Sequence, residues 1–116
     1  MLISQVLAEL YDCTPLIGDE RKLIEVAKAS ARSVGATVVG EYAVSYVPHG
    51  FTVSVFLAES HIVLTTWPEF RLALVDVLLC NASMNPHLVL DTIKETLCPS
   101  GVAVVHEVPR KIHSEP

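Results

Sequence analysis

The sequence predicts an α+β protein in which two helices cover one face of a largely antiparallel sheet. Six stretches rich in Val, Leu and Phe are separated by turn residues, as expected of strands. Two further stretches carry apolar residues at helical spacing. The order of these elements is βαββ followed by ββαβ. An arrangement of this kind gives a two-layer α/β sandwich with both helices on the same face.

Composition limits the class of protein. The chain has 116 residues, enough for a single domain over 1–116, and its 51% hydrophobic content predicts a folded protein. A net charge of -5 argues against nucleic acid as a partner. No apolar run is long enough for a membrane span, and the N-terminus lacks the basic residues of a signal peptide. Three cysteines without a Cys-x-x-Cys pair favour a reduced, cytoplasmic protein.

The N-terminal third should contain one strand and one helix. Residues 3–11 alternate imperfectly between apolar and polar side chains, which favours a strand. A connection over 16–18 leads to Asp19, which is suited to cap a helix that runs to about Val34 and ends at Gly35. The core-facing residues would be Val6, Ala8 and Leu10 on the strand, and Leu23, Ala27, Ala31 and Val34 on the helix.

Four strands should follow. Residues 37–47 and 51–58 are predicted to form a hairpin, because Pro48-His49-Gly50 lies between them. A polar Glu59-Ser60 joint leads to a strand over 61–66, which ends before Pro68 because proline cannot donate to the ladder. Residues 70–80 should form the longest strand.

The C-terminal third should contain a second helix and a last strand. Asn85 is a good helix cap, and Pro86 suits the first helical position. Leu90, Ile93 and Leu97 would face the core, and Cys98-Pro99-Ser100-Gly101 would end the helix. A strand over 102–108 and a loose polar tail over 109–116 complete the prediction.

The second face of the sheet should also be covered. It carries apolar side chains, and the chain is short for its apolar content. A sheet from a partner subunit packed face to face would bury them, so we expect a homodimer or a higher homo-oligomer.

One stretch resembles a known self-cleavage site. Residues 57–69 read L-A-E-S-H-I-V-L-T-T-W-P-E. They are similar to the pattern L-A-E-S-H-I-S-I-H-T-W-P-E of the short, prokaryotic-type S-adenosylmethionine decarboxylases. The resemblance covers 7–108 in element order and is most specific over 48–80. It implies a two-layer α/β protomer that dimerises face to face. It also implies a pyruvoyl cofactor, formed when Ser60 attacks the carbonyl of Glu59 and the chain is cut between 59 and 60.

The resemblance also implies roles for four other residues. Cys80 would be the acid that reprotonates the carbanion after carbon dioxide leaves, which a thiol can do near neutral pH. Tyr46 would stack on the adenine ring, and Glu69 would accept hydrogen bonds from the ribose hydroxyls. Thr52 stands where the family has a serine whose hydroxyl assists processing.

Thr65 departs from the family pattern. The family has a histidine at this position, which helps the ester intermediate to eliminate, and a threonine hydroxyl cannot accept a proton near neutral pH. Three outcomes are open: slow processing, processing that uses another group such as His61, or no processing. Gln5 also lies where the family often has a histidine.

Each of these residues has a simpler alternative. Ser60 could be a turn serine and Cys80 a buried core thiol. His61 could equally be a structural histidine or a catalyst. Tyr46 could pack on a strand, and Glu69 could cap a turn.

Other polar residues give no site of their own. His49, His87, His106 and His113 show no metal-ligand spacing, so no metal site is predicted. Asp76 lies inside an apolar strand. A buried carboxylate there would need partners, either in the active-site loop or at a dimer interface.

The function predicted from the sequence is therefore that of a pyruvoyl-dependent decarboxylase. S-adenosylmethionine is the first substrate to consider, and its product would donate aminopropyl groups for spermidine synthesis. Two alternatives remain. One is a diverged decarboxylase of a small basic amino acid such as ornithine or arginine. The other is an unprocessed, non-catalytic paralogue that regulates an active decarboxylase.

Overall fold

A computed structural model describes residues 3–113 and confirms the predicted α+β class and order of elements. Residues 114–116 of the predicted loose tail lie outside the described residues. The strands are β1 (Ser4–Tyr11), β2 (Val38–Ser45), β3 (Phe51–Leu57), β4 (Ser60–Trp67), β5 (Leu72–Leu79) and β6 (Val102–Val108). The helices are α1 (Glu20–Ser33) and α2 (Pro86–Leu97), with short 3₁₀ turns η1 (Pro15–Gly18) and η2 (Pro68–Phe70).

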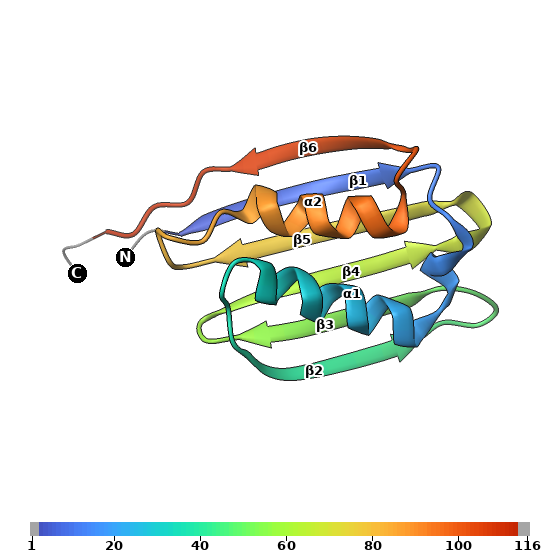
Figure 1. Ribbon diagram of the computed structural model, residues 1–116, viewed down its shortest axis with the longest axis horizontal. Helices are drawn as coiled ribbons and strands as arrows, with labels where there is room; N and C mark the ends of the chain where they lie inside the picture. Colours follow the sequence, from blue (N-terminus) through green and yellow to red (C-terminus); the bar gives the residue numbers. More distant parts are fainter. Residues whose placement is uncertain (1–2, 114–116) are drawn as a thin grey trace.

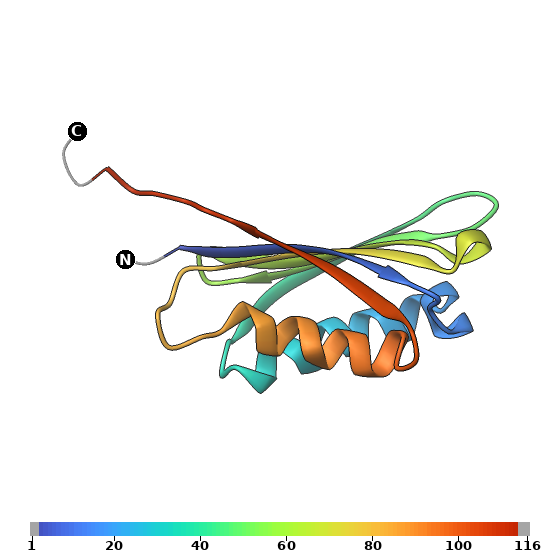
Figure 2. The same cartoon turned by 90° about the horizontal axis from the view of Figure 1, so that it is seen from above.

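The strands form one sheet in the order β2-β3-β4-β5-β1-β6, and every neighbouring pair is antiparallel. Both helices pack on the same face of this sheet, side by side (Figure 1). Seen from above, the helices lie below the sheet and its upper face carries no helix (Figure 2). No helix within residues 3–113 is long and apolar enough to cross a membrane.

The core lies between the sheet and the two helices. The predicted core residues of β1, Val6, Ala8 and Leu10, are each at most 2% exposed. Leu23, Ala27 and Ala31 of α1 are fully buried, whereas Val34 is only partly buried because it caps the helix. Leu90, Ile93 and Leu97 of α2 are also buried. Burying a valine, leucine or isoleucine side chain contributes about 1.5–3 kcal/mol to folding.

The predicted helix caps are present. The Asp19 side chain accepts a hydrogen bond from the Lys22 N–H, and the Asn85 side chain accepts one from the His87 N–H. Pro86 begins α2, where its missing N–H costs nothing. Gly35 has a φ of 80°, the left-handed conformation that ends many helices. Local sequence therefore determines where both helices start.

The ends of several strands differ from the prediction. The strand predicted over 70–80 spans only Leu72–Leu79, and β1, β2 and β4 are just as long. It is shorter at its start because η2 continues to Phe70 and Arg71 then adopts a left-handed φ of 53°. The connection predicted over 16–18 is a 3₁₀ turn that begins at Pro15. The strand predicted over 37–47 is Val38–Ser45.

The exposed face of the sheet is rich in apolar side chains. On each strand they alternate with the buried residues that face the helices. Leu7 and Leu74 are each 36% exposed, and Phe56 is 46% exposed. Tyr42, Val44 and Val104 extend this apolar surface over the outer strands.

The β2–β3 loop is held against β4. Gly50 has a φ of 97°, and a Cβ atom there would overlap the carbonyl oxygen of Thr66. The Phe51 N–H donates to the Thr66 Oγ1 at 3.2 Å, and the Tyr46 N–H donates to the Gly50 carbonyl at 2.9 Å. This loop is therefore fixed at the end of β4 that carries Thr65 and Thr66.

We predict that Gly50→Ala destabilises the protein more than Gly35→Ala does. Both glycines have a positive φ, which costs an alanine about 1–2 kcal/mol. At Gly35 the new methyl group meets nothing within 4 Å, whereas at Gly50 it meets backbone that cannot move aside. Urea unfolding of the two variants measures the difference. Equal losses would show that the loop is not packed against Thr66.

Candidate active site

The turn between β3 and β4 carries the Glu59-Ser60 peptide bond. Leu57 pairs with Ser60, so Ala58 and Glu59 are the only turn residues, and Ser60 begins β4 rather than lying in a separate joint. Glu59 has a φ of 60°, which is unfavourable for a residue with a side chain. Backbone strain therefore lies at the residue that provides the carbonyl of the predicted scissile bond.

Cys80 is positioned at this turn by the end of β5. Its Sγ lies 3.4 Å from the Glu59 carbonyl oxygen and 3.7 Å from that of Ala58. The Ser60 hydroxyl donates to the Ala58 carbonyl at 3.3 Å. A cavity of about 280 Å³ opens here, and Glu59, Ser60, Cys80 and Met84 are among its lining residues. The thiol thus donates to the carbonyl that the Ser60 hydroxyl would attack.

Tyr46, Thr52 and Thr65 are joined through their hydroxyl groups. Thr52 and Thr65 are paired across β3 and β4, and their Oγ1 atoms lie 3.0 Å apart. The Tyr46 hydroxyl lies 2.7 Å from the Thr52 Oγ1. Tyr46 and Thr65 also line a second cavity of about 330 Å³, together with Glu69 and His49. This cavity unites the predicted substrate-binding residues with Thr65, the predicted departure from the family pattern.

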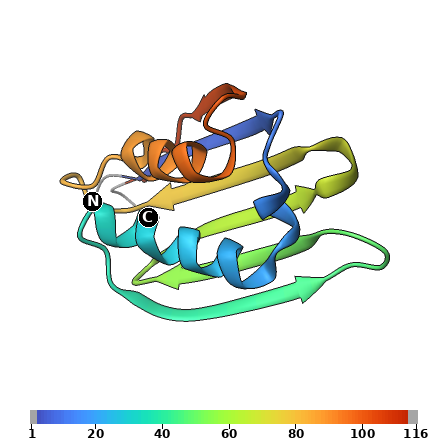
Figure 3. The same ribbon diagram turned by 45° about the vertical axis from the view of Figure 1, so that its right-hand side comes forward.

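The two cavities lie at opposite ends of the sheet. The β3–β4 turn is at one end, and the β2–β3 loop and η2 are at the other (Figures 1 and 3). Ser60 and Thr65 are five residues apart on one strand, which corresponds to roughly 16 Å. Within one chain, the structure therefore brings Glu59, Ser60 and Cys80 together but keeps them apart from Thr52, Thr65, Tyr46 and Glu69.

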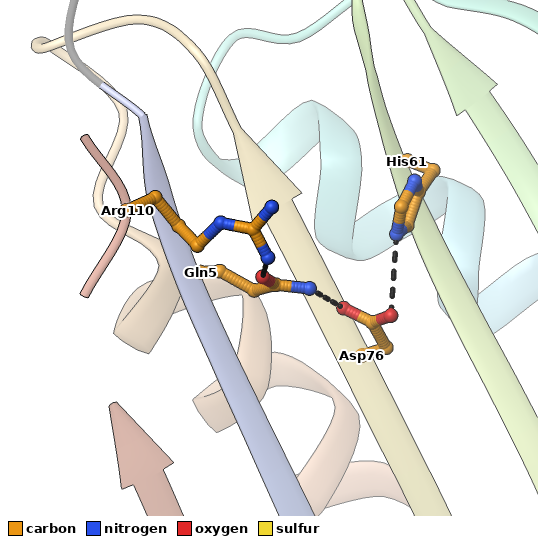
Figure 4. A network of polar contacts seen from close by, with 4 residues as sticks. All are labelled: Gln5, His61, Asp76 and Arg110. Atoms are coloured by element: carbon orange, nitrogen blue, oxygen red, sulfur yellow. Dashed lines mark hydrogen bonds and ion pairs between the residues drawn. The ribbon is translucent and has the colours of Figure 1, made fainter. Parts of the chain in front are cut away.

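His61 belongs to a third polar group on the exposed face of the sheet (Figure 4). Its Nε2 lies 3.3 Å from Asp76 Oδ2, and Gln5 Nε2 donates to Asp76 Oδ1 at 3.0 Å. Arg110 then donates to the Gln5 side-chain oxygen at 3.0 Å. The Asp76 side chain is 34% exposed in the single chain. Its partners are on β1 and β4 rather than in the turn.

The sequence did not predict that Gln5 and Arg110 belong to this polar group. Asp76 in an apolar strand was a signal that a polar partner lay nearby. Gln5 and Arg110 could not be chosen as its partners, because they lie 71 and 34 positions away in the chain. Only the pairing of β1 with both β5 and β6 brings these segments together.

The other two cysteines differ from Cys80 in their surroundings. Cys13 and Cys98 are each at most 1% exposed. Burial, and to a smaller extent the neighbouring Cys98 thiol, raises the pKa of Cys13 to about 12. All three cysteines are free thiols. Within residues 3–113, no cluster of three or more His, Cys, Asp or Glu side chains has an arrangement suited to a metal.

The fold and these groups define a two-layer α+β protein with a strained serine-containing turn at one end of its sheet. A family model described as S-adenosylmethionine decarboxylase matches residues 4–111. The S-adenosylmethionine decarboxylase proenzyme of Pyrobaculum arsenaticum is 36% identical over 112 residues, which cover 95% of this chain and 89% of that protein. The corresponding proenzyme of Thermosipho africanus is 35% identical over 104 residues, which cover 89% of this chain and 80% of that protein.

A solved structure agrees with these relatives. The adenosylmethionine decarboxylase of Aquifex aeolicus aligns with a TM-score of 0.82 and 32% identity, over 99% of this chain and 95% of that one. The chain belongs to the S-adenosylmethionine decarboxylase family. The family suggested by the resemblance is thus confirmed. Members of this family are pyruvoyl-dependent carboxy-lyases whose proenzymes form the pyruvoyl group from an internal serine.

We predict that Cys80 is the only cysteine of the native protein that iodoacetamide alkylates at pH 8. Cys80 is half-buried beside a cavity, whereas the high pKa of Cys13 and the burial of Cys98 keep both unreactive. Peptide mass mapping should find one modified site before unfolding and three after it. The Cys80→Ser variant is the control and should remain unmodified in the native state. Native labelling of Cys13 would contradict the structure.

Proposed function

We propose that this chain is a pyruvoyl-dependent decarboxylase of S-adenosylmethionine that processes itself at Glu59-Ser60. The contact between the Cys80 thiol and the Glu59 carbonyl carries this proposal. A donor at that oxygen stabilises the negative charge that develops when a hydroxyl attacks the carbonyl carbon. The strain at Glu59 also favours attack, because breaking the turn releases it.

Processing would follow from the groups at this turn. The Ser60 Oγ attacks the Glu59 carbonyl carbon, the Glu59-Ser60 C–N bond breaks, and an ester forms with a free Ser60 amine. Loss of the Ser60 Cα proton then breaks the Cβ–Oγ bond and releases Glu59 as a carboxylate. The residue left at position 60 takes up water and loses ammonia, which leaves a pyruvoyl group. The products would be residues 1–59 and 60–116.

The residues around Ser60 suit such a group. It would stand at the start of β4, beside the 280 Å³ cavity and the Cys80 thiol. A pyruvoyl group supplies the electron sink that decarboxylation of an α-amino acid needs. Cys80 would hold the proton that replaces the lost carboxylate. Tyr46 would stack on the adenine ring, and the Glu69 carboxylate would bind the ribose hydroxyls.

A homodimer would complete the site. The predicted residues are split between the two ends of β4, so neither end contains all of them. Suppose two sheets pack face to face around a two-fold axis that is parallel to the sheets and perpendicular to the strands. The Ser60 end of one protomer then meets the Thr65 end of its partner. Each dimer would hold two composite sites.

The exposed face of the sheet supports this assembly. Leu7, Phe56 and Leu74 are apolar and more than one-third exposed in the single chain. Large apolar side chains exposed on one face of a sheet are typical of a protein interface. His61, Asp76 and Gln5 would lie within the same interface, where their mutual hydrogen bonds satisfy them.

The free thiols and the charge of the chain complete the proposal. Three reduced cysteines suit a cytoplasmic enzyme, and a net charge of -5 favours a cationic small molecule over nucleic acid. Decarboxylated S-adenosylmethionine would serve spermidine synthesis, as the sequence predicts.

We predict that Ser60→Ala abolishes both cleavage and decarboxylation and leaves the fold intact. The variant lacks the attacking hydroxyl, and a small residue at a strand end costs little stability. Intact-mass measurement should give two fragments for the wild type and a single 12.6 kDa chain for the variant. Carbon dioxide release should be measured with S-adenosylmethionine, ornithine and arginine. Ser100→Ala, in an exposed loop, is the matched control.

The outcomes separate the three functions. Cleavage that persists in Ser60→Ala would overturn the pyruvoyl proposal. A processed wild type that releases carbon dioxide only from ornithine or arginine would show a diverged amino acid decarboxylase. A wild type that remains whole and inactive would favour the non-catalytic paralogue.

We predict that Leu7→Lys dissociates the dimer and stops processing. A lysine at this position would place a charge in the apolar interface, while Asp76 beside it on β5 keeps the single chain folded. Sedimentation should show a monomer, and the chain should remain uncleaved. Leu88→Lys, on the exposed face of α2, is the control and should change neither result. A monomeric variant that still cleaves would contradict the composite site.

A further inference from the structure

The histidines within residues 3–113 differ in their partners. His61, His87 and His106 each contact a carboxylate, that of Asp76, Glu107 and Glu9 respectively. No hydrogen bond or ion pair among the described residues involves the His49 side chain, and the same holds for His113 in the exposed C-terminal segment. His49 is thus an imidazole without a carboxylate partner.

The β2–β3 loop places this imidazole beside Thr65. His49 directly precedes Gly50, whose backbone packs against the Thr66 carbonyl. On the other side of Gly50, the Phe51 N–H is bonded to the Thr66 side chain. His49 therefore belongs to a loop with a defined position, and it lines the 330 Å³ cavity together with Thr65.

The other polar groups of this cavity are poor proton acceptors for the elimination. Tyr46 and Glu69 are the other titratable residues that line it. A neutral phenol does not readily accept a proton, and a carboxylate is a weaker base than an imidazole. The Thr65 hydroxyl is hydrogen-bonded to the Thr52 hydroxyl. It can therefore orient neighbouring groups, but it cannot act as a base.

We propose that His49 is the proton acceptor of self-processing, in the role that Thr65 cannot fill. The inference rests on the proposed function and on its composite dimer. His49 Nδ1 or Nε2 takes the Cα proton of the ester form of Ser60 in the partner subunit. The electron pair of the C–H bond forms the Cα–Cβ double bond, and the Cβ–Oγ bond breaks. The Glu59 carboxylate leaves with the electron pair of the Cβ–Oγ bond, and His49 later returns its proton to water.

His61 is the alternative acceptor, and its geometry is less favourable. Its Nε2 is already directed to Asp76. His49 would approach Ser60 from the partner, across the interface.

The decisive experiment compares His49→Gln with the wild type during processing. Glutamine keeps a polar side chain of similar size but accepts no proton at neutral pH. Processing should slow by about 10²–10⁴-fold, the usual contribution of general-base catalysis. Because the acyl shift does not need this base, the ester should accumulate. Hydroxylamine, which attacks esters, should then cut the variant between 59 and 60, as seen by intact mass.

A second substitution tests whether the lost function is that of an imidazole. Thr65→His should restore processing when it is added to His49→Gln, because it supplies an imidazole in the same cavity. Thr65→His alone should process at least as fast as the wild type. His113→Gln is the matched control and should process at the wild-type rate.

The results distinguish this inference from the proposed function. His49→Gln that cleaves at the wild-type rate overturns the inference, and a slowed His61→Gln or Tyr46→Phe would then identify the acceptor. His49→Gln that is whole and insensitive to hydroxylamine also overturns it, since the defect would precede the ester. A wild type that neither cleaves nor reacts with hydroxylamine overturns both the inference and the proposed function.

Discussion

The packing of two helices against one face of an antiparallel sheet is the constraint on which the rest of this structure depends. It buries alternate residues of every central strand and leaves the intervening residues on a second face. That face is also apolar, with Leu7, Phe56 and Leu74 partly exposed. Within residues 3–113, no further helix or strand covers it (Figure 2). The same alternation that builds the core therefore creates a surface suited to a second copy.

This constraint also explains why the candidate site is divided. Antiparallel strands place their turns at alternate ends of the sheet, so the β3–β4 turn and the β2–β3 loop cannot meet within one chain. The turn provides a strained peptide bond and a thiol donor. The loop end provides an aromatic ring, a carboxylate and a row of hydroxyl groups. In the proposed dimer, a partner in the opposite orientation would bring the two ends together, so the site would form only on assembly.

Much of the fold was predictable because its signals are local. Asp19, Gly35, Asn85 and Pro86 determine the helix ends through caps that involve only neighbouring residues. Strand ends were less predictable, since η2 and the left-handed Arg71 depend on packing that the sequence does not display. The candidate site residues were predicted from a motif, but their division between two ends follows from strand length and register. The link from Arg110 to Asp76 depends on three strands that are distant in sequence.

Thr65 illustrates how a chemical change can leave a fold undisturbed. A β-branched residue suits a strand, and its hydroxyl finds a partner at once in Thr52, which in turn contacts Tyr46. No side-chain polar atom of the described residues is buried without a hydrogen bond, so the substitution leaves no unsatisfied group. The stability of the fold therefore does not require a histidine at this position. Only the proton transfer does, and the inferred role of His49, which lines the same cavity, would relax that requirement as well.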